Sequence, residues 1–417
     1  MRIAYLVPEF PGQTHIFFWR EIDALRQRGI EARLISSRHP PRKVVSHSWA
    51  AVGEAKTTYL GEMSARDALD AAIGFLRCGP LGWLKSIKAA LSSCPVRKLP
   101  RNLALLLCAA RLVGIMKREN LSHIHVHSCG DLGLVAAFAN RLAGCRYSLT
   151  LHGPLSDYGG QQNIKFRHAA FAIAITKTLK ESIRKALGRD APSRIGVAPM
   201  GVDPLTFFRK VPFKPWNGGR LVLFSCGRLT PVKGHQELIA AVSSLREKGI
   251  DAHLSIAGED DVGGSGYHTE LTALIDKLGL KNEVDLLGAV SERRVLEELR
   301  RAHMFALASH CEPLGVAIME ALSCGTPVIA TNAGGVPEII DHNQSGYLVA
   351  PKSAEAIADA VMALIKDPSL QKRFSEAGRT KIIEKFNSDI GAVELKNLLD
   401  IVADSNEEMQ TLHESAP

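Results

Sequence analysis

The stretch of the sequence best suited to chemistry contains two glutamates near the start of a predicted helix. Residues 309–338 read SHCEPLGVAIMEALSCGTPVIATNAGGVPE. A strand is predicted just before residue 309, and a helix is predicted from about residue 314. Glu312 therefore precedes this helix, and Glu320 lies two turns along it. Because an α-helix turns about 100° per residue, positions eight apart are offset by about 80°, and both carboxylates can face one cleft. The N–H groups at the helix start, a favourable place for a phosphate, belong to Leu314, Gly315 and Val316. Solvated surface glutamates are the alternative.

A second polar loop, GRLTPVKG at 227–234, follows another predicted strand. Its first glycine allows close backbone approach to a ligand. Arg228 and Lys233 place two cations at the carboxyl end of that strand, where a diphosphate would sit. The loop is not a Walker A motif, because its lysine precedes the final glycine instead of following it. Two unrelated surface cations are the alternative.

The first half of the chain offers a histidine after a strand. His152, in TLHG, follows a predicted strand, and a neutral imidazole can hydrogen-bond a substrate hydroxyl or a phosphate oxygen. A histidine that caps a turn is the alternative. Asp157 and Tyr158 lie a few residues further on, and Gly12 lies in the loop PEFPGQTH after the first predicted strand.

No pattern in the sequence indicates a metal or a nicotinamide cofactor. The histidines at 123, 125 and 127 share one face of a predicted strand, but no acidic or cysteine ligand accompanies them. The acidic cluster at 259–261 lacks D-x-D spacing, and GGSG at 263–266 is not a dinucleotide fingerprint. We expect no metal and no cofactor.

Buried-strand patterns alternate with amphipathic helix patterns along the chain, which is typical of parallel sheets flanked by helices. An irregular stretch separates the second and third strands. The predicted strands are 3–7, 32–36, 123–127, 147–151, 172–175, 221–226, 252–257, 284–287, 303–307, 328–330 and 347–349. Since such sheets bind ligands beyond the carboxyl ends of their strands, the polar loops above lie where a site is expected.

This α/β pattern predicts two doubly wound, Rossmann-like domains that face a cleft. We expect an N-terminal domain at 1–207, a linker rich in Pro, Gly and Lys at 208–219, and a second domain at 220–385. A C-terminal helix at 386–404 and a polar, frayed tail at 405–417 complete the chain.

Composition and charge narrow the class of protein further. The 417 residues are 46% hydrophobic and 23% charged, which excludes a largely disordered chain. The net charge of +8 conceals a split, because residues 1–200 carry 29 Lys and Arg against 13 Asp and Glu, and residues 201–417 carry 22 against 30. The basic half predicts an anionic partner. Scattered cysteines, and a start without the apolar run of a signal peptide, predict a cytoplasmic location without a transmembrane helix.

The positive charge is concentrated in a basic insert at 71–118, which holds nine Lys and Arg and no Asp or Glu. Aromatic and aliphatic residues such as Phe75, Trp83 and Ile87 are interleaved with them. This mixture predicts an amphipathic helix docked on an anionic leaflet, peripherally at the inner face of the cell membrane. A solvated helix face is the alternative. Nucleic acid is not expected as a partner, because its recognition motifs are missing.

The ordered string around the two glutamates points to a family. Glu312-x7-Glu320, followed by CGTPVIAT and GGVPEII, closely resembles the signature of family-4 retaining glycosyltransferases with the GT-B fold. The resemblance covers nearly the whole chain and is strongest at 198–350, and FPGQTHIFFWREI looks like members of the exopolysaccharide or colanic-acid type. It implies transfer of a sugar, with retention, from a nucleotide-diphosphate donor to a lipid-linked or saccharide acceptor.

The resemblance also implies roles on the donor side. Glu312 would contact the donor sugar hydroxyls and Glu320 the ribose hydroxyls, since a carboxylate suits bidentate hydrogen bonding to a vicinal diol. Arg228 and Lys233 would form the diphosphate clamp, which offsets charge on the leaving group.

On the other side, His152 would be the cleft histidine near the donor sugar and the acceptor. Asp157 and Tyr158 would lie in an acceptor-side loop. Gly12 would approach the donor phosphate, although family members often carry paired glycines there and this chain has one.

Two other functions stay open. One is a non-catalytic scaffold of a polysaccharide assembly complex. The other is a different GT-B enzyme, either a sugar-nucleotide epimerase or a phosphorylase. The acid–base residues that an epimerase needs and the cofactor-binding lysine that a phosphorylase needs are not evident in the sequence.

Overall fold

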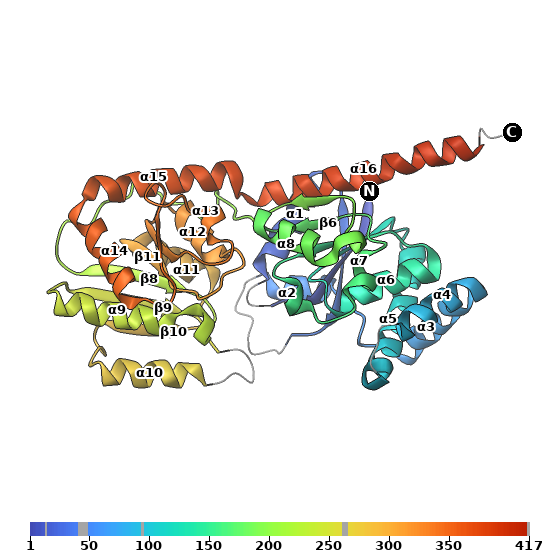
Figure 1. Ribbon diagram of the computed structural model, residues 1–417, viewed down its shortest axis with the longest axis horizontal. Coiled ribbons are helices and arrows are strands. Elements are labelled where there is room, and N and C mark those ends of the chain that lie inside the picture. Colours follow the sequence, from blue (N-terminus) through green and yellow to red (C-terminus); the bar gives the residue numbers. More distant parts are fainter. Residues whose placement is uncertain (13–14, 41–48, 93–95, 261–265, 415–417) are drawn as a thin grey trace. The chain divides into compact units, whose positions relative to one another are not determined.

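The computed structural model describes residues 1–12, 15–40, 49–92, 96–260 and 266–414, and the chain divides into two compact units. Unit 1 comprises the described residues up to Pro199 together with those from Asp389 onward, and unit 2 comprises Met200–Ser388 (Figure 1). The division therefore falls eight residues before the predicted end of the first domain at 207. The predicted linker at 208–219 lies inside unit 2, and the C-terminal helix belongs to unit 1.

Unit 1 is built on one parallel sheet of seven strands in the order β3-β2-β1-β4-β5-β6-β7. The strands are β1 (Arg2–Glu9), β2 (Glu31–Arg38), β3 (Thr58–Tyr59), β4 (His123–His127), β5 (Tyr147–Leu151), β6 (Ala172–Ala174) and β7 (Ile195–Val197). Helices cover both faces of this sheet, so its inner strands must be buried on both sides. The apolar run Ile3–Val7 of β1 meets that requirement, because all five side chains are fully buried.

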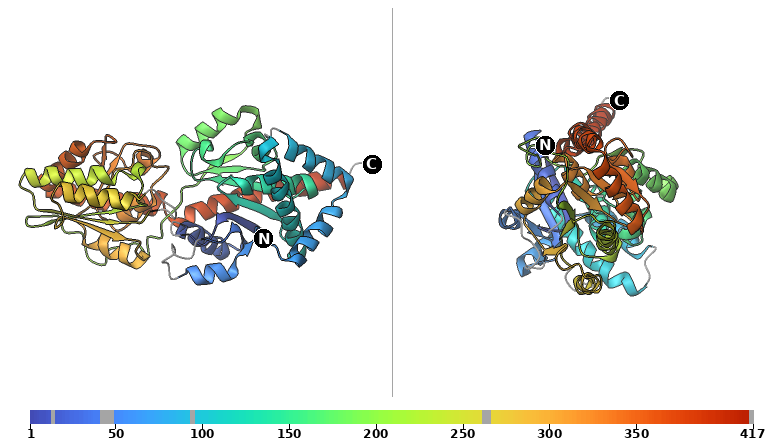
Figure 2. Two further views of the ribbon diagram at one scale, coloured as in Figure 1. Left: turned by 90° about the horizontal axis from the view of Figure 1, so that it is seen from below. Right: turned by 90° about the vertical axis from the view of Figure 1, so that its left-hand side faces the viewer.

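The helices of unit 1 include four that lie in the stretch predicted to be irregular. The helices are α1 (Ile16–Gln27), α2 (Ala50–Lys56), α3 (Ala65–Leu76), α4 (Gly79–Leu91), α5 (Leu99–Arg118), α6 (Asp131–Ala143), α7 (Gln162–Phe166), α8 (Lys177–Leu187) and α16 (Ser388–Glu414). Helices α3, α4 and α5 pack against one another, and α4 and α5 also pack against α6 (Figure 2). The basic insert is thus a group of packed helices instead of one surface helix.

The start of α3 shows how the sequence fixes a helix boundary. The Ser64 hydroxyl accepts a hydrogen bond from the Asp67 N–H at 3.1 Å, and the Asp67 carboxylate accepts from the Ser64 N–H at 3.1 Å. This reciprocal capping box satisfies two N–H groups that the helix itself leaves without partners.

Helix α5 is long and apolar enough to cross a membrane by length and composition alone, which the sequence reading did not predict. Within unit 1, 44% of its most apolar window is buried. A buried core helix satisfies the same test of length and composition.

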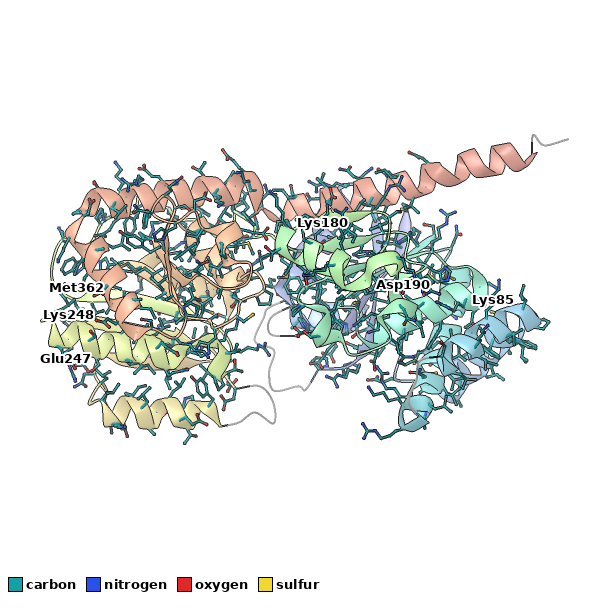
Figure 3. The ribbon with its side chains drawn as sticks, viewed as in Figure 1. Lys85, Lys180, Asp190, Glu247, Lys248 and Met362 are labelled. Atoms are coloured by element: carbon teal, nitrogen blue, oxygen red, sulfur yellow. The ribbon has the colours of Figure 1, made fainter. Side chains whose placement is uncertain are left out.

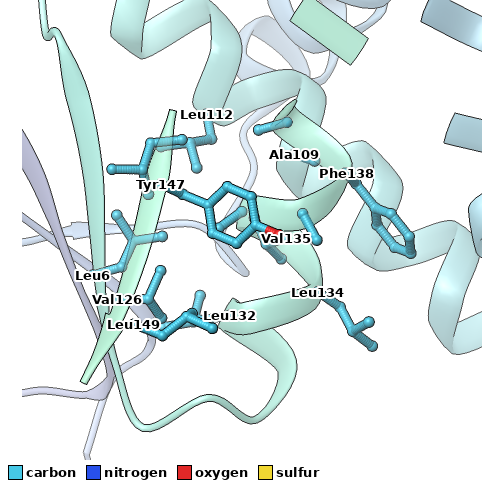
Figure 4. Close-up of a cluster of buried hydrophobic side chains, with 14 of the residues drawn as sticks. Leu6, Ala109, Leu112, Val126, Leu132, Leu134, Val135, Phe138, Tyr147 and Leu149 are labelled. Carbon is cyan, nitrogen blue, oxygen red and sulfur yellow. The ribbon is translucent and has the colours of Figure 1, made fainter. Parts of the chain in front are cut away.

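The core between the sheet and α6 is apolar and closely packed (Figure 4). Leu6, Val126 and Leu149 come from three neighbouring strands, and Val135 from α6. Tyr147 lies among them with its ring fully buried, and its hydroxyl donates to the Lys165 carbonyl at 2.8 Å. Its polar atom therefore has a partner inside the core.

Unit 2 repeats the architecture with a parallel sheet of six strands in the order β10-β9-β8-β11-β12-β13. The strands are β8 (Leu221–Cys226), β9 (Ala252–Ala257), β10 (Val284–Gly288), β11 (Met304–Leu307), β12 (Val328–Thr331) and β13 (Tyr347–Val349). The helices are α9 (His235–Glu247), α10 (Tyr267–Lys277), α11 (Glu292–Arg301), α12 (Val316–Ser323), α13 (Val336–Ile339), α14 (Ala354–Lys366) and α15 (Pro368–Lys385). The two sheets confirm the predicted α/β fold. The predicted cluster at 259–261 and the glycines at 263–266 fall in part on 261–265, outside the described residues.

The last helix, α16, returns the chain to unit 1 (Figure 1). Ala392, Leu395, Leu398 and Leu399 are buried in a cluster with residues of β1, α1 and β2. The helix runs on to Glu414, beyond its predicted end at 404. Residues 405–414 consist mostly of good helix formers such as Glu, Met, Gln and Leu, whose intrinsic propensity continues the helix although the sequence is polar.

Candidate active site

In unit 2, the two predicted donor-side loops lie at the point where the strand order reverses. Strands β8 and β11 are neighbours, while the chain runs outward from β8 through β9 on one side and from β11 through β12 on the other. In such sheets the ligand crevice lies beyond the carboxyl ends of these two strands. The loop 227–234 follows β8, and the loop with Glu312 follows β11.

A buried ion pair joins these two loops. Lys233 Nζ donates to Glu312 Oε2 at 2.5 Å, and the side chains are 17% and 7% exposed. The Ser309 hydroxyl donates to the same carboxylate oxygen at 3.0 Å. The pair brings together two residues that are 79 positions apart in sequence and that the motifs placed in one site.

Two glycines allow the loops to approach this closely. Gly234 has φ +69°, and a Cβ atom there would lie 2.0 Å from the Ala308 carbonyl oxygen. A Cβ atom on Gly334, at φ +61°, would lie 2.1 Å from the Glu312 carbonyl oxygen. Any side chain at either position would push apart the backbone segments that hold the ion pair.

The helix start predicted near Leu314 lies at Val316, the first residue of α12. Gly315 precedes it with φ +97°, and Leu314 is buried. The first N–H groups of an α-helix have no partners within the helix, so this end remains suited to a phosphate.

Glu320 lies on α12 and is 8% exposed. It affects the nearby Cys226 thiol at the end of β8, whose pKa is raised to about 12 by burial and by the Glu320 charge, while Lys233 acts in the opposite direction. Glu320, Lys233 and the end of β8 are therefore electrostatic neighbours, as the predicted site requires. Arg228 is exposed, and its carbonyl lies 3.1 Å from Nε2 of the buried His235, which fixes the course of the loop.

In unit 1, His152 is part of a chain of polar groups that the motifs did not reveal. His152 Nε2 lies 2.9 Å from His127 Nδ1. His127 Nε2 lies 3.0 Å from Glu21 Oε2, although the carboxylate is off the direction of a ring N–H bond. The Tyr5 hydroxyl donates to this same oxygen at 2.5 Å.

This arrangement favours one tautomer of each imidazole. Burial lowers the pKa of His127 to about 3, so its ring is neutral at pH 7 and carries a single N–H. The Glu21 carboxylate favours that proton on Nε2, and Nδ1 then accepts a hydrogen bond from His152 Nε2. His152 is left with its lone pair on Nδ1.

The other two histidines of β4 have structural partners. His123 Nε2 and His125 Nδ1 each lie 2.8 Å from the Ser148 hydroxyl, and His125 Nε2 lies 3.0 Å from the Thr150 hydroxyl. Their shared face therefore packs against β5. Among the described residues, no group of three or more His, Cys, Asp or Glu side chains is arranged to hold a metal ion.

The remaining predicted residues of unit 1 lie close to His152 or to β1. The Tyr158 hydroxyl accepts a hydrogen bond from the His152 N–H at 2.9 Å, so it holds the backbone of the histidine in place. Asp157 is exposed. Gly12 follows β1, and a Cβ atom there would meet the His15 ring at 2.3 Å.

Sequence reasoning missed several polar residues around these sites. Glu21 and His127 support His152, and Ser309 supports Glu312. His310 Nε2 lies 2.8 Å from Glu237 Oε1, and the backbone N–H of His310 donates to the Val232 carbonyl at 2.7 Å. The position of His127, Ser309 and His310 at the ends of strands could have indicated them from the sequence. Glu21 lies in the middle of a helix, where no sequence pattern indicates a role.

Comparison with known protein families also divides the chain into two parts, at a boundary a few residues after Pro199. The family model "Glycosyl transferases group 1" matches residues 208–381, and the model "Glycosyltransferase Family 4" matches residues 16–204. The chain belongs to these glycosyltransferases. It is accordingly a transferase enzyme, and the predicted family and enzyme class are confirmed.

Individual relatives of this glycosyltransferase are distant. WcaL of Salmonella typhimurium, assigned to colanic acid biosynthesis, is 25% identical over 96% of this chain and 100% of its own length. The N-acetyl-alpha-D-glucosaminyl L-malate synthase of Bacillus anthracis is 27% identical over 70% of this chain and 76% of its own.

Solved structures confirm the GT-B fold. HepE of Anabaena, in complex with UDP and glucose, superimposes with a TM-score of 0.71 at 20% identity, over 96% of this chain and 99% of that one. The sucrose-phosphate synthase of Thermosynechococcus elongatus superimposes with a TM-score of 0.70 at 19% identity, over 97% of this chain and 100% of that one.

Proposed function

We propose that this glycosyltransferase moves a sugar, with retention of anomeric configuration, from a nucleotide-diphosphate donor to a lipid-linked or saccharide acceptor in polysaccharide biosynthesis. The observation that carries the proposal is the buried Lys233–Glu312 pair beside the start of α12. It places a cation and a carboxylate beside the N–H groups of a helix start, which suits a sugar diphosphate. HepE was solved with UDP and glucose, and WcaL is assigned to colanic acid biosynthesis, which supports this choice of donor and pathway.

The chemistry we propose takes place on one face of the donor sugar. The bond between the anomeric carbon and the diphosphate oxygen breaks, and the acceptor oxygen forms its bond on the same face. The acceptor proton passes to the departing phosphate. Arg228, Lys233 and the N–H groups of α12 stabilise the negative charge on the leaving group, so we propose no metal.

In unit 1 we propose that His152 contacts the donor sugar or the acceptor hydroxyl through Nδ1, with Asp157 on the acceptor side. The Glu21 carboxylate and the His127 ring act as positioning groups, because they set the tautomer and the direction of His152.

Screening nucleotide-diphosphate sugars by thermal shift identifies the donor, and NMR of the product reports its anomeric configuration. We expect one donor class to stabilise the protein and the product to retain the donor configuration. An inverted product would contradict the mechanism, and a protein that neither hydrolyses nor transfers any donor would be a non-catalytic scaffold.

The ribose role of Glu320 gives a separate prediction. Replacing Glu320 with alanine should reduce donor affinity or turnover at least tenfold, about 1.4 kcal/mol, because a bidentate contact to a diol is lost. Calorimetric donor titration and initial rates measure both quantities. Glu355→Ala, an exposed position on α14, is the matched control. Unchanged donor binding and turnover in Glu320→Ala would refute the role.

We also propose that the enzyme acts at the cytoplasmic face of the cell membrane, attached peripherally through α3, α4 and α5. These three helices expose nine large apolar side chains: Leu69, Ile73, Leu76, Leu81, Leu84, Ile87, Leu91, Leu103 and Leu107. Exposed apolar side chains beside many cations suit insertion into an anionic leaflet.

Vesicle sedimentation at low salt tests this attachment. Wild-type protein should sediment with phosphatidylglycerol vesicles and not with phosphatidylcholine vesicles. Leu84→Ser combined with Leu91→Ser should weaken sedimentation at least tenfold, since burying one leucine is worth about 2 kcal/mol. Leu205→Ser, at a position 82% exposed in unit 2, should have no effect. Absence of binding to either vesicle would refute membrane attachment.

A further inference from the structure

A basic cavity of about 850 Å³ lies in unit 1 beside the exposed leucines of α4. It is formed by α4, by the C-terminal end of α6, and by α7 with the residues that follow it. Its charged lining residues are Lys85, Lys88, Arg141, Arg167 and His168.

The charge of this lining has one sign. Two lysines, two arginines and a histidine line the cavity, and no lining residue is an aspartate or glutamate. In the described part of the chain, no ion pair engages Lys85 or Lys88, and both are exposed (Figure 3 labels Lys85). Arg167 pairs with Asp190 at 2.8 Å, so its charge is partly balanced by a carboxylate outside the lining.

The other groups at this end of α6 leave the cavity positive. The negative end of the α6 dipole amounts to about half a unit charge, which offsets only part of the cationic side chains. Arg141 donates to the Ala137 carbonyl at 2.8 Å and to the Ile164 carbonyl at 3.4 Å, and these neutral acceptors do not cancel its charge. The pKa of His168 is lowered by burial and, to a smaller extent, by the charges of Arg141 and Arg167, so these two cations act on the histidine ring.

The rim of the cavity adds an apolar component. Leu81, which is 65% exposed, belongs to the lining, and Leu84 on the same helix is 66% exposed. A small inorganic anion would need only the cations. A ligand that combines a phosphate with hydrocarbon chains would use both features.

We propose that this cavity binds the phosphate-bearing headgroup of an anionic membrane lipid while the neighbouring leucines enter the bilayer. The inference rests on the membrane attachment proposed above and specifies its binding site. Lys85 and Lys88 supply the free charges, Arg141 and His168 supply further N–H donors, and Asn140, Asn163 and Ser92 offer neutral hydrogen bonds. The site belongs to unit 1 alone and is separate from the donor loops of unit 2.

Charge-reversal variants of the full chain test the site. Lys85→Glu with Lys88→Glu should weaken sedimentation with phosphatidylglycerol vesicles at least tenfold. Lys180→Glu with Lys185→Glu, on α8 of the same unit, makes the same change in net charge and should weaken it less than twofold (Figure 3 labels Lys180). Equal losses in the two variants would mean that only net charge matters and would overturn the proposal.

Titration of His168 by NMR separates a lipid from a free anion. Short-chain phosphatidylglycerol should raise the pKa of His168, and inorganic phosphate or diphosphate at the same concentration should not. A response to the free anions without binding to vesicles would overturn the lipid assignment. Donor hydrolysis should be the same in both double lysine variants and in the wild type, so a protein that binds vesicles normally but lacks hydrolysis would contradict the proposed reaction and not this site.

Discussion

Replacing Lys233 with methionine should lower donor turnover at least 100-fold and also destabilise unit 2 by roughly 3 kcal/mol. The loss of turnover follows because a preorganised cation that stabilises charge on the leaving diphosphate contributes about 10²–10³ in rate. The loss of stability follows because Glu312, 7% exposed, would keep its charge without a cation, and removing one partner of a buried pair costs several kcal/mol. Initial rates and urea unfolding measure the two effects.

A double variant separates these two roles of Lys233. Adding Glu312→Gln to Lys233→Met removes the unpaired charge while Ser309 can still bond the amide, so stability should recover by most of the loss. Activity should stay low. Lys281→Met, at a surface lysine of unit 2, is the control and should change neither quantity by much. Turnover above one tenth of wild type in Lys233→Met would contradict the role at the diphosphate.

Acidification should unfold unit 1 well before the pH at which carboxylates titrate. Burial lowers the pKa of His123 and of His127 to about 3, and that of His125 to well below 6.5. In the unfolded chain these groups titrate near 6.5. The unfolded state therefore binds more protons below pH 6.5, so stability is complete above that pH and falls as pH drops toward 3. Each of these histidines lowers the free energy of unfolding by about 1.4 kcal/mol for each pH unit below 6.5, which is roughly 4 kcal/mol for the three at pH 5.5.

This dependence can be followed within unit 1. With Trp216 of unit 2 replaced by phenylalanine, the remaining tryptophans all belong to unit 1, and their fluorescence reports its unfolding in urea. His123→Asn should reduce the slope of unfolding free energy against pH by about a quarter, because burial also holds the pKa of His152 well below 6.5 and four histidines of unit 1 then share the slope. His342→Asn, at an exposed position in unit 2, should leave the slope unchanged. A stability that stays constant from pH 7 to 5 would contradict the prediction.

The regular part of the fold was predictable because it depends on local pattern. Five apolar residues in a row, as in Ile3–Val7, have few alternatives to a buried strand. The two strands missed, β3 and β7, have two and three residues, too short for a period to show. The helices of the basic insert were missed as separate elements, because their boundaries depend on caps such as Ser64 with Asp67 and on packing against α6.

The donor-side site was predictable to a similar extent. The spacing of the two glutamates, the position of Lys233 after a strand and the family resemblance predicted one site for these three residues, and the structure joins Lys233 to Glu312 by a hydrogen bond. The support of His152 was not predictable, because Glu21 comes from a helix and His127 from a strand more than 100 residues later. Such contacts arise only when the tertiary fold brings the elements together.

The path of α16 has a consequence for dissecting the enzyme. Unit 2 is inserted in unit 1, since the chain leaves unit 1 after Pro199 and re-enters it at Asp389. The two crossings lie together: Val202 pairs with Asn387, and a Cβ atom on Gly391 would lie 3.5 Å from the Pro199 carbonyl oxygen. Truncation after Pro199 would therefore strip Leu395 and Leu399 from the core of unit 1, whereas splicing residue 199 to 389 through a short peptide would preserve that core. The two ends of unit 2 also lie close together, so unit 2 can be circularly permuted or replaced as a whole by another domain.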